Sequence, residues 1–215
     1  GAYVLGVSEF HHALYGELAR RTGATVIVPL YPLAPDGQAS EVVASTTSLL
    51  AELMRQHGAD HVAMLGDSAG GGLALAAAQA VSGGVRELHS LTLISPWLDA
   101  TVSDPRSADI NDPMLDIGWL RACGRLWSGP LSADDPRVSP LFGDLSGLPP
   151  TTVHSGTRDL LYPDALRLTE LARDAGVHVT LDLKPGLIHD WPLFGFVPEA
   201  RATITEIASR LSEPR

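Results

Sequence analysis

Two kinds of hydrophobic pattern alternate along the chain. Some segments repeat apolar residues at three- or four-residue spacing, as Phe10, Leu14 and Leu18 do, and this spacing predicts amphipathic helices. Between them lie short runs that are nearly all apolar, which is typical of strands covered on both faces. We expect helices at 9–22, 39–57, 68–82, 116–127, 161–175 and 198–211. We expect strands at 24–30, 61–65, 89–95, 151–156 and 177–183.

The order of these elements predicts the fold class. Gly23, Gly58 and the Gly83-Gly84 pair are the expected stops of the first three helices, and a strand follows each. Strands that alternate with helices form a parallel sheet with helices on both faces, so we expect an α/β fold. The 215 residues, 45% of them hydrophobic, fit one domain with a sizeable core.

The segment 96–150 interrupts this alternation. It is rich in Pro, Asp and Ser and is too long for an ordinary connection, so we expect it to be a lid-like insertion in the domain. Its expected helix carries Trp119, Leu120 and Trp127. Two interpretations stay open: these side chains line an apolar pocket, or they pack the helix against the domain. Trp97 and Trp191 carry the same ambiguity.

Charge and cysteine content restrict the classes of partner and the cellular compartment that we expect. The 15 Lys and Arg residues stand against 25 Asp and Glu residues, and a net charge of −10 argues against a nucleic-acid partner. The single cysteine, Cys123, rules out an intrachain disulfide and fits a small buried hydrophobe. A chain without disulfides suits a reducing compartment, so the expected location is cytoplasmic. No apolar run reaches the ~18 residues that a membrane span needs.

Residues 66–70 form the most informative motif. They read Gly-Asp-Ser-Ala-Gly, a G-x-S-x-G pattern between an expected strand and an expected helix. A tight strand-to-helix turn would hold Ser68 in a strained conformation with its hydroxyl clear of the sheet. Gly66 and Gly70 would crowd together there, so we expect that both must lack a side chain. The alternatives are a glycine-rich loop with a bystander serine, or a dinucleotide site, for which the G-x-G-x-x-G spacing is missing.

A nucleophilic serine needs a base, and the base needs an acid that orients it. In this architecture the chain order is Ser, then Asp or Glu, then His, each after a strand. His189, in the KPGLIHDW loop after the last strand, is the candidate base. Asp159, just after strand 151–156, is the candidate acid, with Asp164 as a second choice. The other histidines lie before the acid or inside an expected strand: His11, His12, His57, His61, His89, His154 and His178.

Several segments resemble the hormone-sensitive-lipase-like family of α/β-hydrolase esterases, and the resemblance covers nearly all of the chain. GAYVLG is similar to the end of that family's His-Gly-Gly-Gly/Ala motif, and YPLAPDG to its Tyr-Arg-Leu-Ala-Pro-Glu segment. GDSAGG resembles its nucleophile motif, and SPWLD, GTRDLL and GLIHDW its later landmarks. The resemblance implies an α/β-hydrolase fold and a serine carboxylesterase that acts on short- to medium-chain acyl esters. It implies that Ser68 is the nucleophile, Asp159 the acid and His189 the base.

The same resemblance implies an oxyanion hole. Acyl transfer requires hydrogen-bond donors where negative charge develops, and one is the amide of the residue after the nucleophile, here Ala69. Gly1 and Ala2 occupy positions of the family's small-residue motif, which supplies the remaining backbone donors. This chemistry requires no metal or other cofactor. The only partner it requires is a small ester.

The chain departs from the family pattern at several places. Pro32 and Asp36 stand where many relatives have Arg and Glu, and Asp190 follows the candidate base where Gly is common. Relatives also carry further residues before Gly1, which form the first strands, and one of these strands lies beside the strand that leads to Ser68. The resemblance therefore implies a fragment that lacks the N-terminal part of the domain. The alternative is a short enzyme whose sheet closes without that strand.

Other functions stay open at this point. The first is a non-catalytic hydrolase shell that binds a small molecule, although such shells typically lose the base. The second is a serine peptidase on the same fold, although such relatives usually carry a large extra domain. A metal site at His11 and His12 is not expected, because neighbouring residues on a helix point about 100° apart. A homodimer is neither predicted nor excluded.

Overall fold

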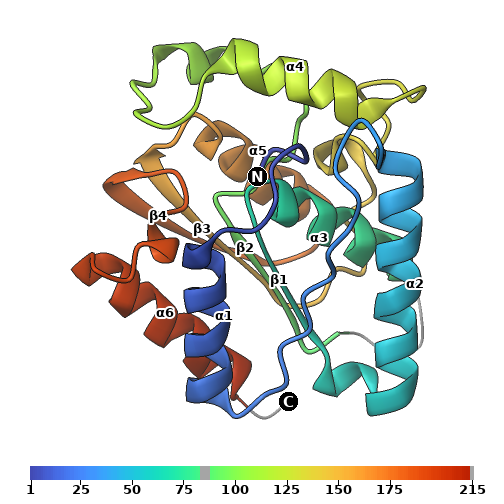
Figure 1. Ribbon diagram of the computed structural model, residues 1–215, viewed down its shortest axis with the longest axis vertical. Helices are drawn as coiled ribbons and strands as arrows, with labels where there is room; N and C mark the ends of the chain where they lie inside the picture. The colour runs from blue at the N-terminus through green and yellow to red at the C-terminus, as the bar shows by residue number, and fades with distance from the viewer. Residues whose placement is uncertain (83–87, 214–215) are drawn as a thin grey trace.

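A four-stranded parallel sheet forms the centre of the molecule (Figure 1). The computed structural model describes residues 1–82 and 88–213. The strands lie side by side in chain order, which places all their carboxyl ends at one edge of the sheet. They are β1 (Ala63–Asp67), β2 (Ser90–Ile94), β3 (Thr151–Arg158) and β4 (Val179–Ile188).

The expected helices form within one or two residues of their predicted bounds. They are α1 (Glu9–Thr22), α2 (Ala39–His57), α3 (Ala69–Val81), α4 (Ile117–Ser128), α5 (Tyr162–Asp174) and α6 (Pro198–Leu211). Gly23 ends α1 in the left-handed region at φ 71°, where a residue without Cβ is unstrained. The stop expected at Gly83-Gly84 lies outside the described residues. Single turns of 3₁₀ helix occur at Ala59–His61, Pro105–Asp109, Pro140–Phe142 and Trp191–Leu193.

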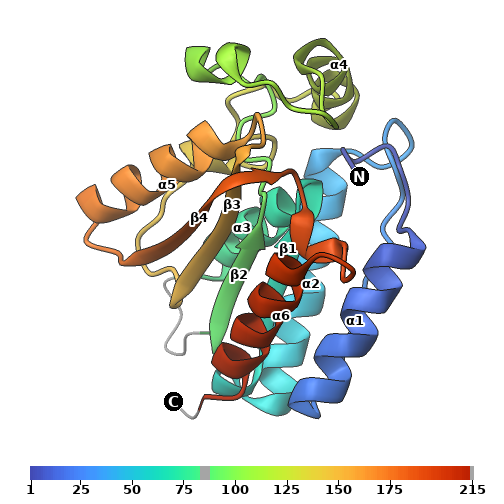
Figure 2. The ribbon, with the colours of Figure 1, turned by 90° about the vertical axis from the view of Figure 1, so that its left-hand side faces the viewer.

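Helices cover both faces of the sheet, as the alternating pattern predicts (Figure 2). On one face, α2, α3 and α5 bury aliphatic side chains against β2 and β3, for example Leu75 and Leu168 against Leu93 and Val153. On the other face, α1 and α6 pack against the end of β2 in a smaller cluster around Ile94. The sheet thus forms the middle of three layers, and its carboxyl edge is left for loops.

Residues 24–30 do not form the expected strand. The segment is irregular, and Val26, Ile27 and Leu30 are 39%, 51% and 76% exposed. A β-branched run favours a pleated surface only where a neighbouring strand takes up its backbone hydrogen bonds. Among the described residues the sheet begins at β1 and offers this segment no ladder. The prediction from composition was therefore wrong for this structure.

The last strand is longer and less buried than the sequence suggests. β4 runs through Pro185 and Gly186 to Ile188, with a register irregularity opposite the end of β3. It lies at the edge of the sheet, so most of its residues are only half-buried, unlike those of β2 and β3. The expected loop before His189 is thus strand, and His189 follows β4 directly.

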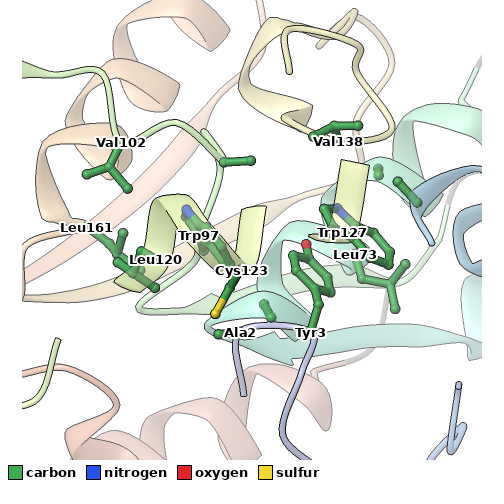
Figure 3. Close-up of a cluster of buried hydrophobic side chains, with 14 of the residues drawn as sticks. Ala2, Tyr3, Leu73, Trp97, Val102, Leu120, Cys123, Trp127, Val138 and Leu161 are labelled. Atoms are coloured by element: carbon green, nitrogen blue, oxygen red, sulfur yellow. The ribbon is translucent and has the colours of Figure 1, made fainter. Parts of the chain in front are cut away.

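The helix α4 crosses above the carboxyl edge of the sheet (Figure 1). Leu120 and Trp127 point down into a buried cluster that also holds Tyr3, Trp97 and Cys123 (Figure 3). The Tyr3 ring stacks on that of Trp127 with centroids 3.7 Å apart. These aromatic residues therefore anchor the helix to the domain, which decides between the two interpretations for Leu120, Trp127 and Trp97. The lid-like role of segment 96–150 stays a prediction.

Candidate active site

Ser68 occupies the turn between β1 and α3. Its backbone adopts φ 52° and ψ −119°, a conformation that costs a non-glycine residue about 1–3 kcal/mol. Two hydrogen bonds hold the turn against the end of β2: the Ser68 amide donates to the Ile94 carbonyl, and the Trp97 amide donates to the Ser68 carbonyl, both at 2.9 Å. The strained conformation expected from the G-x-S-x-G pattern is therefore present, and the surrounding backbone maintains it.

The two glycines of the motif play different roles. A Cβ on Gly66 would lie 2.1 Å from the carbonyl oxygen of Gly70, so no side chain fits there without moving the turn. A Cβ on Gly70 would meet nothing within 4 Å. The expectation that both must lack a side chain is therefore right for Gly66 and wrong for Gly70, because only the main chain of Gly70 takes part in the crowding.

Two further glycines let α3 approach the segment after β2. A Cβ on Gly71 would lie 2.8 Å from that of Pro96, and one on Gly72 would lie 2.3 Å from the carbonyl oxygen of Trp97. Real Cβ contacts are longer than this, so these positions bring the helix close to its neighbour. The first turn of α3 is fixed as a result, and Ser68 with it.

The structure brings the three predicted side chains together. His189 Nε2 lies 3.0 Å from Ser68 Oγ, and His189 Nδ1 lies 3.0 Å from Asp159 Oδ2. The other carboxylate oxygen of Asp159 accepts the amide hydrogen of Leu161 at 2.9 Å, which fixes the carboxylate. All three side chains are buried. This arrangement can move a proton between a hydroxyl and an imidazole whose orientation is held by a carboxylate.

Asp164, the second choice for the acid, lies elsewhere. Its carboxylate contacts Arg167 Nη1 at 2.9 Å on the same helix, and the same guanidinium lies 3.6 Å from Asp99. Burial and the nearby Asp99 raise the pKa of Asp164 to about 7, against the effect of Arg167. Asp164 therefore joins α5 to the segment after β2 and does not orient His189.

A second carboxylate also reaches His189. Asp190 Oδ2 lies 3.1 Å from His189 Nε2, the nitrogen that faces Ser68. Burial opposes charge on His189, but the carboxylates of Asp159 and Asp190 outweigh it and hold the pKa of His189 well above its usual value. Burial raises the pKa of Asp190 to about 6. The sequence singled out Asp190 only as a departure from the common Gly and did not predict this contact.

His11 is a neighbour that sequence reasoning missed. Its Nε2 lies 3.1 Å from Asp67 Oδ2, immediately before Ser68. The Ser8 amide donates to His11 Nδ1 at 3.0 Å, which leaves Nε2 to carry the hydrogen towards Asp67. The hydrogen bond that His11 donates to Asp67 raises the pKa of His11 against the effect of burial. No motif links these residues, since 56 positions separate His11 from Asp67.

The sequence was compared with models of known protein families. Residues 1–193 match a family whose description is 'alpha/beta hydrolase fold'. The chain belongs to the α/β-hydrolase fold family. The match runs from before the turn at Ser68 to beyond His189, so it includes every residue of the cluster.

Relatives of this α/β hydrolase include named lipases and esterases. A triacylglycerol lipase of Mycobacterium tuberculosis is 43% identical over 195 residues, which are 90% of this chain and 40% of the lipase. An esterase of Acinetobacter venetianus is 36% identical over 214 residues, which are 97% of this chain and 71% of the esterase. The chain thus spans less than half of the first relative and under three quarters of the second.

Solved structures agree with these relatives. A crystal structure titled as a hormone-sensitive lipase from a metagenome library matches with a TM-score of 0.93 at 31% identity, over 100% of this chain and 76% of that one. A putative esterase from Staphylococcus aureus matches with a TM-score of 0.92 at 27% identity, over 99% and 73%. The fold class and the resemblance to hormone-sensitive-lipase-like esterases are confirmed.

The expected oxyanion donors of this α/β hydrolase lie at two places. Ala69 is the first residue of α3, where an amide has no acceptor within its own helix. Ala2 is buried in the same cluster as Ala69 and has φ 51°, while the carbonyl of Gly1 accepts the amides of Val4 and Leu5. The assignment of Gly1, Ala2 and Ala69 as oxyanion donors stays a prediction.

Cys123 is buried in the cluster under α4, as expected of a small hydrophobe. Within residues 1–82 and 88–213, no His, Cys, Asp and Glu side chains gather in the threes or more that a metal ion needs. No helix in the same ranges has the length and apolar character to cross a membrane.

Proposed function

We propose that the chain carries the active site of a serine carboxylesterase that hydrolyses short- to medium-chain acyl esters. The observation that carries the proposal is the 3.0 Å contact of Ser68 Oγ with His189 Nε2, continued by the 3.0 Å contact of His189 Nδ1 with Asp159. Membership of the α/β-hydrolase fold family supports it. The names of the relatives, which are lipases and esterases, support it as well.

The first half-reaction would form an acyl-enzyme. The Ser68 Oγ–C bond forms as the hydroxyl proton moves to His189 Nε2, and the carbonyl π electrons move to the oxygen. Backbone amides at Gly1, Ala2 and Ala69 would hold that oxyanion. As the carbonyl re-forms, the ester C–O bond breaks and the Nε2 proton passes to the departing alcohol. Asp159 orients the imidazole and stabilises its charged form throughout.

The second half-reaction would use the same groups with water. His189 Nε2 takes one proton of the water as its oxygen attacks the acyl carbon. The C–Oγ bond then breaks, the proton returns to Ser68 Oγ, and the carboxylic acid leaves. Each proton taken up is given back, so the enzyme ends in its starting state and consumes one water for each ester.

The class of substrate comes from the relatives. They include proteins named acetyl-hydrolase and ethyl acetate hydrolase, and a related crystal was soaked with p-nitrophenyl butyrate. These names describe those proteins, and they favour small acyl groups for this chain too. We also propose a cytoplasmic location. The solution mass of the full-length protein would decide whether it forms the homodimer that the sequence leaves open.

The decisive test uses the full-length protein and p-nitrophenyl butyrate. Ser68→Ala and His189→Ala should each lower kcat/KM by several orders of magnitude, because either change removes a group that acts in every turnover. Ser146→Ala, at an exposed position, is the matched control and should behave as the parent. Activity of Ser68→Ala or His189→Ala within about tenfold of the parent would remove the residue from its role.

A fluorophosphonate probe separates the rival classes. It labels an activated serine, so labelling at Ser68 that is lost in His189→Ala supports an enzyme. A correctly folded full-length protein that is not labelled would favour a non-catalytic binding shell. Hydrolysis of an anilide as fast as that of the matching ester would favour a peptidase.

A further inference from the structure

The reacting nitrogen of His189 has two partners of nearly equal distance. Ser68 Oγ lies 3.0 Å from Nε2, and Asp190 Oδ2 lies 3.1 Å from it. The backbone fixes Asp190 in this place: its φ is 51°, and its amide donates to Ser95 Oγ at 3.0 Å. Its Oδ1 is buried without a hydrogen-bond partner among the described residues. A buried carboxylate in a left-handed position is a costly feature, and a catalytic triad does not require it.

The chemistry of Nε2 shows what this contact favours. Nε2 of the neutral base presents a lone pair to Ser68. A carboxylate beside that lone pair cannot form a hydrogen bond with it, because both groups are acceptors. Nε2 of the imidazolium carries a proton that the Asp190 carboxylate can accept. Asp190 therefore favours the charged form of His189, while Ser68 requires the neutral form.

We propose that Asp190 is a positioning residue that holds the Nε2 proton of His189 in competition with Ser68, and so sets the pH at which the enzyme becomes active. This inference rests on the proposed function, because it assigns His189 the role of base. It assigns Asp190 no bond to the substrate.

The other charged groups near this pair come from three elements. Asp159, after β3, contacts the opposite nitrogen of His189. Asp67, at the end of β1, contacts His11 on α1, and both act on Asp190 only at a distance. Among these groups only Asp190 touches Nε2, so it alone can take the proton directly.

The same contact has a second consequence in catalysis. The imidazolium forms when Ser68 or water attacks, and a carboxylate next to Nε2–H stabilises that state. Removal of the carboxylate should make His189 a base at lower pH, and a weaker base once it is neutral. Asp190 thus lowers activity at acid pH, but it makes His189 a stronger base at the higher pH where His189 is neutral.

The test follows kcat/KM of the full-length protein from acid to mildly alkaline pH. Asp190→Asn keeps the shape and Asp190→Gly suits the left-handed backbone, so both should fold. In both variants the acid limb of the profile should move to lower pH by about one unit or more. Asp182→Asn is the matched control, since Asp182 contacts Nδ1 of another buried histidine, His154, at 3.0 Å, and the acid limb of this variant should not move.

The pH dependence of fluorophosphonate labelling at Ser68 provides a second readout that needs no turnover. It should shift in the same direction. An acid limb that stays at the parent's pH in both Asp190 variants overturns the inference, while unchanged hydrolysis and labelling leave the esterase proposal intact. Loss of activity at every pH in both folded variants also overturns it, because Asp190 would then be essential rather than a competitor. If the parent is not labelled at Ser68, the proposed function fails first.

Discussion

Two buried histidines of this molecule each hold an aspartate at the same distance, yet only one pair faces a serine. Nδ1 of His189 lies 3.0 Å from Asp159, and Nδ1 of His154 lies 3.0 Å from Asp182. His154 is inside β3, directly opposite Asp182 in the register with β4. Its Nε2 is buried and has no hydrogen-bond partner within the described residues. His189 lies just beyond β4, where Nε2 meets Ser68.

The difference shows that a His–Asp pair is not by itself an active site. His154 lies on β3, between β2 and β4, and its side chain is fully buried, so no substrate can reach it. A pair at the carboxyl edge of a parallel sheet faces the loops, where ligands bind in open α/β sheets. The position of the histidine along its strand therefore decides which chemistry the same two side chains can do.

The sharpest way to break this comparison is to make the same substitution in both acids. Asp159→Asn should lower kcat by about 10⁴-fold, because an amide can no longer hold His189 in the required tautomer. Asp182→Asn should leave kcat for p-nitrophenyl butyrate unchanged. Steady-state kinetics at a single pH near neutrality measure both. Equal losses in the two variants would show that the pairs do not differ as the geometry indicates.

A second test removes the serine from reach and leaves both histidines in place. Gly66→Ala puts a Cβ 2.1 Å from the Gly70 carbonyl, so the turn and Ser68 must move. A displacement of about 1 Å costs on the order of 10²-fold in rate, and kcat/KM should fall by at least that much. His189–Asp159 would then be a buried pair without a serine, like His154–Asp182.

Gly70→Ala is the matched control for that change. Its Cβ has free space, and alanine is a better helix former than glycine, so activity and stability should both be retained. A Gly70→Ala variant as inactive as Gly66→Ala would mean that the turn tolerates no substitution at all. Tm values of both variants separate a moved turn from a loss of folding.

The smallest expected effect concerns the contribution of the His154–Asp182 pair to stability. The pKa of Asp182 is lowered by a hydrogen bond from His154. Burial opposes this shift, and a hydrogen bond from Lys184 adds to it. A carboxyl whose pKa is lower in the folded state stabilises the fold above its unfolded pKa, about 3.9, and loses that contribution as pH falls. Asp182→Asn should therefore lower Tm modestly at neutral pH, and the gap to the parent should close below about pH 4. A gap that widens with acid would contradict this sign.

The sequence predicted most of the fold because local and tertiary preferences agree there. The helix α1, for example, has its apolar spacing, its basic last turn and its Gly23 stop in one segment. Segment 24–30 failed for the opposite reason: its β-branched residues need a partner strand that the described residues do not supply. The meeting of Ser68, Asp159 and His189 could be predicted because chain order at strand ends is a topological rule.

The contacts that the sequence did not predict arise from the close approach of distant segments. Asp190 contacts Nε2 from a left-handed backbone conformation, and no pattern in the sequence encodes that conformation. His11 reaches Asp67 because α1 packs beside β1, which periodicity alone does not specify. The asymmetry between Gly66 and Gly70 depends on which atoms point inward, and a motif that treats both positions alike cannot show it.

The short segment after β2 supports both Ser68 and the residue that follows His189. Ile94 and Trp97 hold the backbone of Ser68, and Ser95 between them holds the amide of Asp190, the residue next to His189. Ser68 and His189 are thus both anchored to the same few residues rather than to two separate parts of the domain. A motion of this segment would carry Ser68 and His189 along together, and the distance between Ser68 Oγ and His189 Nε2 would be preserved.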